Sequence, residues 1–230
     1  MRLLRTSLLA VLLVSGASAA VLVPSDAQAS VSIAVGFDAL VKDADSVGVA
    51  TPVESKCVWE EGRIYTYTRL KVEQGVAGEL GTGAEGWVRT MGGVVGKIGQ
   101  MVDGEPVFTT GKSSLLFMRK FKASGTWEIA ARAQGLYPVL VDDTAKTRKV
   151  IRSAAVGVLY PPRVTAEATS ASSSLKPQSA AASQAATDAA KPVRLAGEVI
   201  HDRPLDEVAR DIASSWKKLH PPPAQGDTKK

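Results

Sequence analysis

Apolar positions follow two different periods in the part of the chain that begins near residue 35. Within 36–44 they recur at helical spacing with acidic residues between them, and this predicts a short amphipathic helix. From Ser46 to about Val53 the period becomes two, which is typical of a β-strand. Residues 63–72 alternate in the same way, so Glu60-Glu61-Gly62 between the two strands predicts a hairpin connection.

Shorter strand patterns continue to residue 151, with turn residues between them. The connector 142–146 suits a hairpin turn before the last strand. The additional predicted strands are 86–91, 114–118, 127–131, 137–141 and 148–151. Seven short strands separated by turns are typical of an all-β barrel or sandwich, and residues 35–163 are enough to bury a core of their own.

The pattern changes again after residue 163. Residues 164–192 are mostly alanine, serine, threonine and glutamine, so we expect a disordered linker with too little apolar surface to bury. Region 193–220 predicts an amphipathic helix, capped by Asp202 or Arg203 and with Pro204 in its first turn. Its apolar stripe comprises Leu205, Val208, Ile212, Trp216 and Leu219. The stripe must be buried either on the barrel or on a partner, and 221–230 is expected to be a disordered tail.

The N-terminus has the order of a cleavable export signal. Arg2 and Arg5 precede an apolar stretch at 8–14, and Ala27-Gln28-Ala29 forms an A-x-A site before Ser30. We therefore expect residues 1–29 to be removed and the mature protein to be periplasmic or secreted, with no transmembrane segment after cleavage. The alternative is a retained membrane anchor, although the apolar stretch is shorter than the roughly 20 residues that span a bilayer.

Composition narrows the classes of function. The formal net charge of +5 comes from scattered basic residues, which does not favour nucleic-acid binding. Cys57 is the single cysteine, so the chain cannot form an internal disulfide. The thiol is expected either to be buried or to form an intermolecular bridge.

The motifs of the common catalytic classes are absent from the sequence. His201 and His220 flank the predicted C-terminal helix without forming a zinc-binding pattern. Gly111-Lys112-Ser113 resembles the end of a phosphate-binding loop, but Pro106 occupies the position of a required glycine. No G-x-S-x-G elbow is present, and the glycine-rich segment 92–104 is interpreted as a long flexible barrel loop. We therefore expect no catalytic residue, no metal site and no cofactor.

Two groups of residues are candidates for binding a partner. The first, on the polar face of strand 63–72, comprises Tyr65, Tyr67 and Arg69. The second, on the stripe of the C-terminal helix, comprises Val208, Ile212 and Trp216. Aromatic and arginine side chains on one strand face suit a protein contact or stacking on a ligand. The alternative is that the C-terminal helix covers this face of the strand.

Several short motifs follow one another between Asp43 and Met118. They are Ala44-Asp-Ser-Val-Gly-Val-Ala50, Ile64-Tyr-Thr-Tyr-Thr68, Leu70-Lys-Val-Glu73, Gly92-Gly-Val-Val-Gly96, Gly104-Glu-Pro-Val-Phe108 and Gly111-Lys-Ser-Ser-Leu-Leu-Phe117. This order resembles a group of exported bacterial domains, some of which precede matrixin-like metalloproteases. It is also similar to the OB-fold barrel of the netrin-like domains in tissue inhibitors of metalloproteases. The resemblance implies a small OB-like β-barrel.

The chain departs from these families in two ways. The inhibitors use an N-terminal cysteine and several disulfides, whereas this chain has only Cys57, so their mechanism is not implied. No zinc-binding helix follows the predicted barrel, so proteolysis is not implied either. We expect a mainly β protein, an OB-like barrel with a short N-terminal helix, that acts as a non-enzymatic exported module binding an envelope or secreted protein partner. The alternatives are a protease-associated or inhibitor-like protein and a module that binds cell-wall oligosaccharides.

Overall fold

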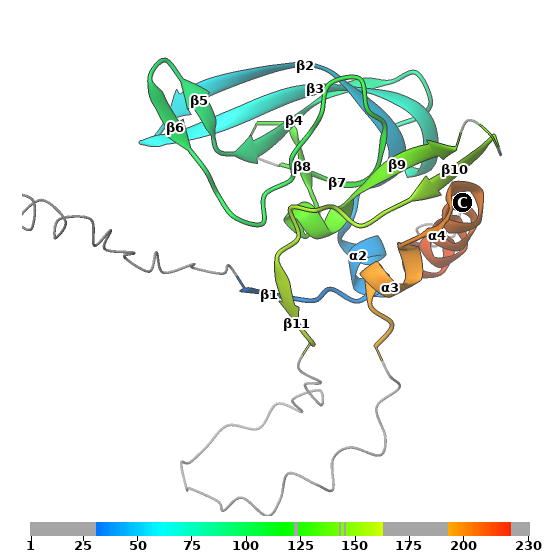
Figure 1. Cartoon of the computed structure of the whole chain (residues 1–230). Helices are drawn as coiled ribbons and strands as arrows, with labels where there is room; N and C mark the ends of the chain where they lie inside the picture. The colour runs from blue at the N-terminus through cyan, green and yellow to red at the C-terminus, as the bar shows by residue number, and fades with distance from the viewer. Residues whose placement is uncertain (1–30, 122–123, 143, 145, 163–192, 222–230) are drawn as a thin grey trace, which may run out of the picture.

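The computed structural model describes residues 31–121, 124–142, 144, 146–162 and 193–221 (Figure 1). The predicted signal peptide at 1–29 and the predicted linker at 164–192 lie outside these residues, as does the predicted tail beyond Pro221. Among the described residues, no helix combines the length and the apolar character needed to cross a membrane.

Five strands form a closed barrel. They are β2 (Ser46–Glu60), β3 (Arg63–Gly78), β4 (Glu85–Met91), β7 (Ser114–Lys120) and β8 (Trp127–Ile129). Neighbours around the barrel are β2, β3, β4, β8 and β7, and β7 pairs again with β2. Every pair is antiparallel except β4 with β8, which meet in parallel at Val88 and Trp127. The predicted fold class, mainly β with a small barrel, is therefore confirmed.

The remaining elements extend or cover this barrel. The additional strands are β1 (Val31–Ile33), β5 (Gly93–Val95), β6 (Ile98–Gln100), β9 (Leu136–Asp142), β10 (Thr147–Val150), β11 (Val158–Tyr160) and β12 (Arg203–Pro204). The helices are α2 (Phe37–Asp43), the 3-10 helix η1 (Arg132–Gly135), α3 (Ala196–Ile200) and α4 (Leu205–Leu219). All seven predicted strands are present, as are both predicted helices. Strands β9, β10 and β12 continue the sheet outward from β7.

The hairpin between β2 and β3 turns at two of the three residues that were predicted to connect the strands. Glu61 and Gly62 have φ values of 49° and 78°, and Glu60 pairs with Arg63 on either side of them. Positive φ at both central residues is the turn geometry that matches the twist of the two strands. The hairpin predicted from Glu60-Glu61-Gly62 is thus confirmed.

The prediction of a long flexible loop at 92–104 is wrong, because this segment contains the β5–β6 hairpin. Its glycines are used for close packing and for turning. Gly92 and Gly93 have φ values of 98° and 133°, which an L side chain rarely adopts. A Cβ on Gly93 would approach Thr66 Oγ1 to 2.5 Å, so the chain crosses directly over the β2–β3 hairpin.

Two apolar clusters share the strands β2 and β7. One fills the barrel and includes Leu116 and Met118. The other lies between the barrel wall and the helices, and includes Leu115 and Phe117 from the same strand. Successive residues of β7 point to opposite faces of the sheet, and all residues from Leu115 to Met118 are buried. Both faces of the strand are therefore covered, which explains the continuous apolar run at 115–118.

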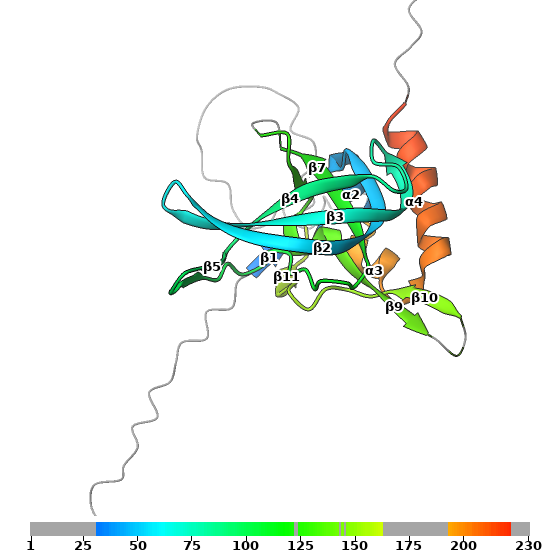
Figure 2. The same ribbon diagram turned by 90° about the horizontal axis from the view of Figure 1, so that it is seen from above.

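Helix α4 packs back on the barrel, which decides between the two alternatives for its apolar stripe. Leu205, Val208 and Ile212 are fully buried in the cluster that also contains α2, α3 and β7 residues. Figure 2 shows α4 at one end of the barrel, opposite the β5–β6 hairpin. Full burial of such side chains stabilises a fold by about 1.5–3 kcal/mol each. The apolar stripe of α4 therefore belongs to the cluster between the barrel wall and the helices.

The predicted cap of this helix is also corrected. The helix begins at Leu205, with Pro204 in the N-cap position and without a side-chain cap. Asp202 instead pairs with Lys149 at 3.4 Å, and Arg203 forms an ion pair with Asp211 at 2.9 Å. The reason is tertiary, because Arg203 and Pro204 pair with β10 before the helix starts.

Candidate functional site

Strand β3 presents a polar face away from the barrel interior. Its alternate residues Ile64, Thr68 and Leu70 are buried, which leaves Tyr65, Tyr67 and Arg69 half-buried on the opposite side. Cross-strand partners on β2 and β4 extend this face. We call it the outer face, and it comprises Glu54, Lys56, Glu60, Tyr65, Tyr67, Arg69, Trp87 and Arg89.

Cations cover two of the aromatic rings on the outer face. The Arg89 guanidinium lies 3.7 Å from the centroid of the Tyr65 ring. The Lys56 ammonium lies 4.7 Å from the centroid of the Trp87 ring. Both distances are within the range in which a cation is attracted to a ring, so the outer face holds its aromatic side chains in fixed positions.

Ion pairs and a hydrogen bond fix the other side chains of the outer face. Arg69 donates to Glu54 and to Glu85, each at 2.7 Å. These hydrogen bonds raise the pKa of Arg69 above its ordinary value, so it stays charged. The Tyr67 hydroxyl donates to Glu60 at 2.8 Å. Burial raises the pKa of Tyr67, and the Glu60 carboxylate raises it further, so this hydroxyl stays protonated at neutral pH.

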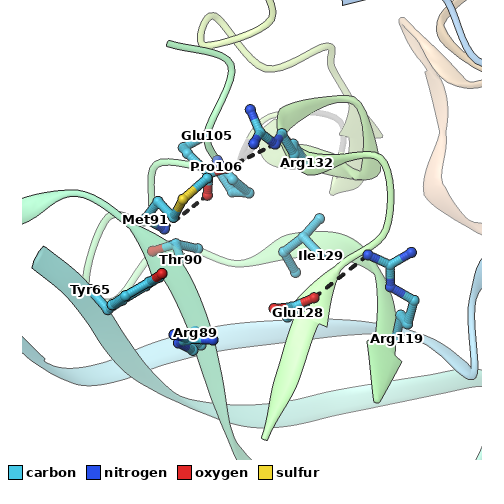
Figure 3. Close-up of a pocket in the computed structure, with 10 residues that line it drawn as sticks. All are labelled: Tyr65, Arg89, Thr90, Met91, Glu105, Pro106, Arg119, Glu128, Ile129 and Arg132. Carbon is cyan, nitrogen blue, oxygen red and sulfur yellow. Dashed lines mark hydrogen bonds and ion pairs between the residues drawn. The ribbon is translucent and has the colours of Figure 1, made fainter. Parts of the chain in front are cut away.

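A hollow of about 240 Å³ lies where the outer face meets the end of the barrel (Figure 3). Three arginines reach it from three elements, β4, β7 and η1. Its lining comprises Tyr65, Arg89, Thr90, Met91, Glu105, Pro106, Arg119, Glu128, Ile129 and Arg132. We call it the arginine hollow, and it shares Tyr65 and Arg89 with the outer face.

The two glutamates of the arginine hollow are already engaged. Glu105 accepts the backbone N–H of Met91 at 3.0 Å, and its other oxygen lies 3.1 Å from Arg132 Nε. Glu128 lies 3.6 Å from Arg119, which also contacts Asp43 at 3.3 Å. Figure 3 marks the Glu105–Arg132 and Glu128–Arg119 pairs with dashed lines.

Arg89 is the most enclosed of the three arginines. Its side chain is 15% exposed, and one nitrogen lies 3.4 Å from Glu60. Its Nε is buried and has no hydrogen-bond partner among the residues that the structure describes. The Phe121 ring lies 5.0 Å away, so Arg89 lies close to two aromatic rings.

A second hollow, of about 270 Å³, lies next to the first. The two share Thr90, Met91, Glu105 and Pro106. Its other polar lining includes Thr66, whose hydroxyl donates to the Gly92 carbonyl at 2.7 Å. The Cys57 thiol, half-buried rather than enclosed in the core, lies 3.3 Å from the same hydroxyl.

The structure separates the two groups of predicted binding residues. Tyr65, Tyr67 and Arg69 lie together on the outer face, as their alternation predicts. Val208 and Ile212 lie in the interior cluster at 1% and 0% exposure, so no partner can reach them in this fold. Trp216 is half-buried against the same cluster and stacks on His220 at 3.9 Å. The helix stripe therefore serves packing within the molecule.

Sequence reasoning missed most of the arginine hollow. The alternation of Trp87 and Arg89 in strand 86–91 was a signal that could have placed both on the outer face. Arg119 and Arg132 carried no such signal, because they reach the hollow only through the pairing of β7 with β8 and the position of η1. Within the described residues, no three His, Cys, Asp or Glu side chains are grouped to hold a metal ion.

Comparison of the chain with protein-family profiles, with curated proteins and with solved structures gives no match in any of the three.

Proposed function

We propose that the protein is a non-enzymatic exported module that binds an envelope or secreted protein partner through its outer face. The observation that carries this proposal is the set of half-exposed side chains Tyr65, Tyr67, Trp87 and Arg69 on adjacent strands. Tryptophan, tyrosine and arginine are the residues that contribute most to protein–protein binding energy. Export is supported by the signal-peptide pattern at residues 1–29.

The rigidity of the outer face supports the proposal further. Arg89 lies over Tyr65, and Arg69 is held between two carboxylates. Side chains that are already ordered lose little conformational freedom when a partner binds. The outer face is therefore prepared for a contact before the partner arrives.

We also assign the barrel to the OB-fold type, on the strength of its strand order. Around the barrel the strands follow as first, second, third, fifth and fourth along the chain, and the third and fifth are parallel. OB-fold barrels bind ligands on the face of their second and third strands. Those strands correspond to β3 and β4, which carry most of the outer face. This support is an analogy between folds.

A cell-wall oligosaccharide is the second candidate ligand, since OB-fold barrels also bind sugars on this face. Stacking on a sugar requires an open ring face. Arg89 covers one face of Tyr65 and Lys56 covers one face of Trp87. This arrangement favours the protein partner. A protease-associated role is supported by the family resemblance alone.

The test is affinity capture by immobilised residues 30–230 from envelope and culture-supernatant fractions, read by mass spectrometry. Tyr65→Ser and Arg69→Glu should lose the specific protein that the unaltered chain retains. Tyr160→Ser and Arg210→Glu are the matched controls, because both side chains are exposed on other elements, β11 and α4. Both controls should retain it.

Two outcomes would count against the proposal. The first is that no protein is retained by the unaltered chain while it binds isolated peptidoglycan, which would favour the sugar-binding alternative. The second is equal retention by Tyr65→Ser, Arg69→Glu and the controls, which would place the contact elsewhere. Thermal unfolding of each variant checks that loss of capture is not loss of the fold.

A further inference from the structure

We infer that the arginine hollow is a binding site for a single carboxylate group, which the partner supplies from an acidic side chain or from its chain terminus. That a protein partner supplies the carboxylate rests on the proposed function. That the hollow binds a carboxylate is independent of the proposed function, because it follows from the arginine side chains and the volume described above.

The hollow is rich in unused hydrogen-bond donors. A guanidinium carries five N–H donors in a fork that matches the two oxygens of a carboxylate. Arg89 and Arg119 meet their carboxylate partners only at 3.3 to 3.6 Å. Strong charge-assisted hydrogen bonds are shorter, about 2.7–2.9 Å. Within the described residues, most of the guanidinium donors therefore have no short hydrogen bond and can donate to an incoming anion.

Aromatic contacts fix the position of Arg89. The rings of Tyr65 and Phe121 lie at 3.7 and 5.0 Å and hold the guanidinium in place. Arg89 therefore stays at the wall of the hollow when no ligand is bound.

The charge balance favours a monoanion over a dianion. The lining holds three arginines and two glutamates, 3 − 2 = +1, but Asp43 and Glu60 pair with these arginines from outside the lining and bring the local sum to 3 − 4 = −1. Binding therefore depends on the guanidinium hydrogen-bond donors and not on a net positive charge. A phosphate dianion would meet this excess of negative charge, so we expect a carboxylate to bind more tightly than phosphate.

Shape and access agree with a side-chain-sized group. The volume of about 240 Å³ is larger than a carboxylate alone, and Met91, Pro106 and Ile129 offer apolar wall for the carbon atoms that carry it. Arg119 and Arg132 have 46% and 55% of their side chains exposed, so the hollow is open to solvent on their side. A partner lying on the outer face can reach it, since both share Tyr65.

The test uses residues 30–230 in an NMR titration at constant ionic strength. The probes are N-acetyl-glutamate α-methylamide, its neutral glutamine counterpart, N-acetyl-alanine and inorganic phosphate. Saturable shifts of the Thr90, Met91 and Ile129 amides are expected with the charged carboxylates and not with the glutamine probe, and phosphate should bind more weakly than the carboxylates. The tighter of these two carboxylate probes identifies the source as a side chain or a chain terminus.

Variants make the site assignment specific. Arg132→Gln should weaken the carboxylate at least about fivefold, whereas Arg210→Gln, an exposed arginine on α4, should leave it unchanged. Arg119→Lys keeps the positive charge but loses the forked arrangement of N–H donors, so it should also weaken binding of the carboxylate. It provides a second variant if Arg132→Gln unfolds.

The inference is overturned if the neutral glutamine probe gives the same shifts, if phosphate binds more tightly than either carboxylate, or if Arg132→Gln and Arg119→Lys bind like the unaltered chain. Because no partner is present in this titration, its result is independent of the capture experiment. Carboxylate binding with failed capture would refute the proposed function alone, and the reverse result would refute the hollow alone.

Discussion

Truncation of Ile212 to alanine tests whether α4 belongs to the barrel. Ile212 is 0% exposed, in the cluster that joins α4 to α2 and to the barrel wall. The change removes three carbon atoms, worth roughly 0.8 kcal/mol each, and adds the cost of a cavity. We expect Ile212→Ala to lower the free energy of unfolding by about 3 kcal/mol, within the range of about 2–5 kcal/mol for such substitutions.

Urea unfolding of residues 30–230 measures this loss with two probes. In a Trp216→Phe background the remaining tryptophans, Trp59, Trp87 and Trp127, all lie on barrel strands, so fluorescence reports the barrel. Helical circular dichroism reports the helices. With a slope of about 2 kcal/mol per molar urea, both midpoints should fall together by about 1.5 M.

Ile98→Ala is the matched control, since this isoleucine on β6 is 57% exposed. Its free energy of unfolding should stay within about 0.5 kcal/mol of that of the unaltered chain. The reasoning fails if Ile212→Ala lowers only the helical signal while the barrel fluorescence unfolds at its original midpoint. In that case α4 would be a separate unit that rests on the barrel without stabilising it.

Two further substitutions test the packing of particular residues. Burial raises the pKa of Tyr137 above its ordinary value of 10.0. Above pH 10 the unfolded chain therefore loses the hydroxyl proton while the folded chain keeps it. The free energy of unfolding should be unaffected by this group below pH 10 and should fall as the pH rises above 10. Tyr137→Phe should flatten that alkaline loss in unfolding curves measured between pH 8 and 11, and an equal loss in the variant would contradict the assignment. Gly78→Ala should cost about 2 kcal/mol or more, since φ is +86° and the new Cβ would lie 2.2 Å from the Asp45 carbonyl oxygen. A Cβ on Gly81 would have nothing within 4 Å, so Gly81→Ala should change the free energy of unfolding by less than about 0.5 kcal/mol. Equal effects of the two substitutions would refute the close contact at Gly78.

Much of the secondary structure could be predicted, because short-range spacing carries it. The two-residue period of 63–72 correctly separated the buried Ile64 and Leu70 from Tyr65 and Tyr67 on the outer face. The sequence pattern gave a wrong prediction where glycine residues can serve either a flexible loop or a tight turn. At 92–104 they serve tight turns and close contacts of the β5–β6 hairpin, and composition alone could not distinguish this from a flexible loop.

The candidate site was predictable only in part. Tyr65, Tyr67 and Arg69 lie on one strand, so their shared face follows from local geometry. Arg119 and Arg132 are separated from them by long stretches of chain, and nothing in their own neighbourhoods marks them as parts of a hollow. The pairing of strands that are distant in sequence depends on how the whole barrel closes, so a local pattern could not predict which arginines meet at the hollow.

The sequence by itself determined where the five barrel strands, β9, β10, α2 and α4 form, and that the stripe of α4 had to be buried, because periodicity and apolar content are local properties of the chain. Only the tertiary structure decided that Val208 and Ile212 pack on the barrel and not on a partner. It also decided that both faces of β7 are covered and that three arginines converge beside Tyr65. The physical reason is that closing the barrel brings together residues that are distant in sequence, and no local pattern records those contacts.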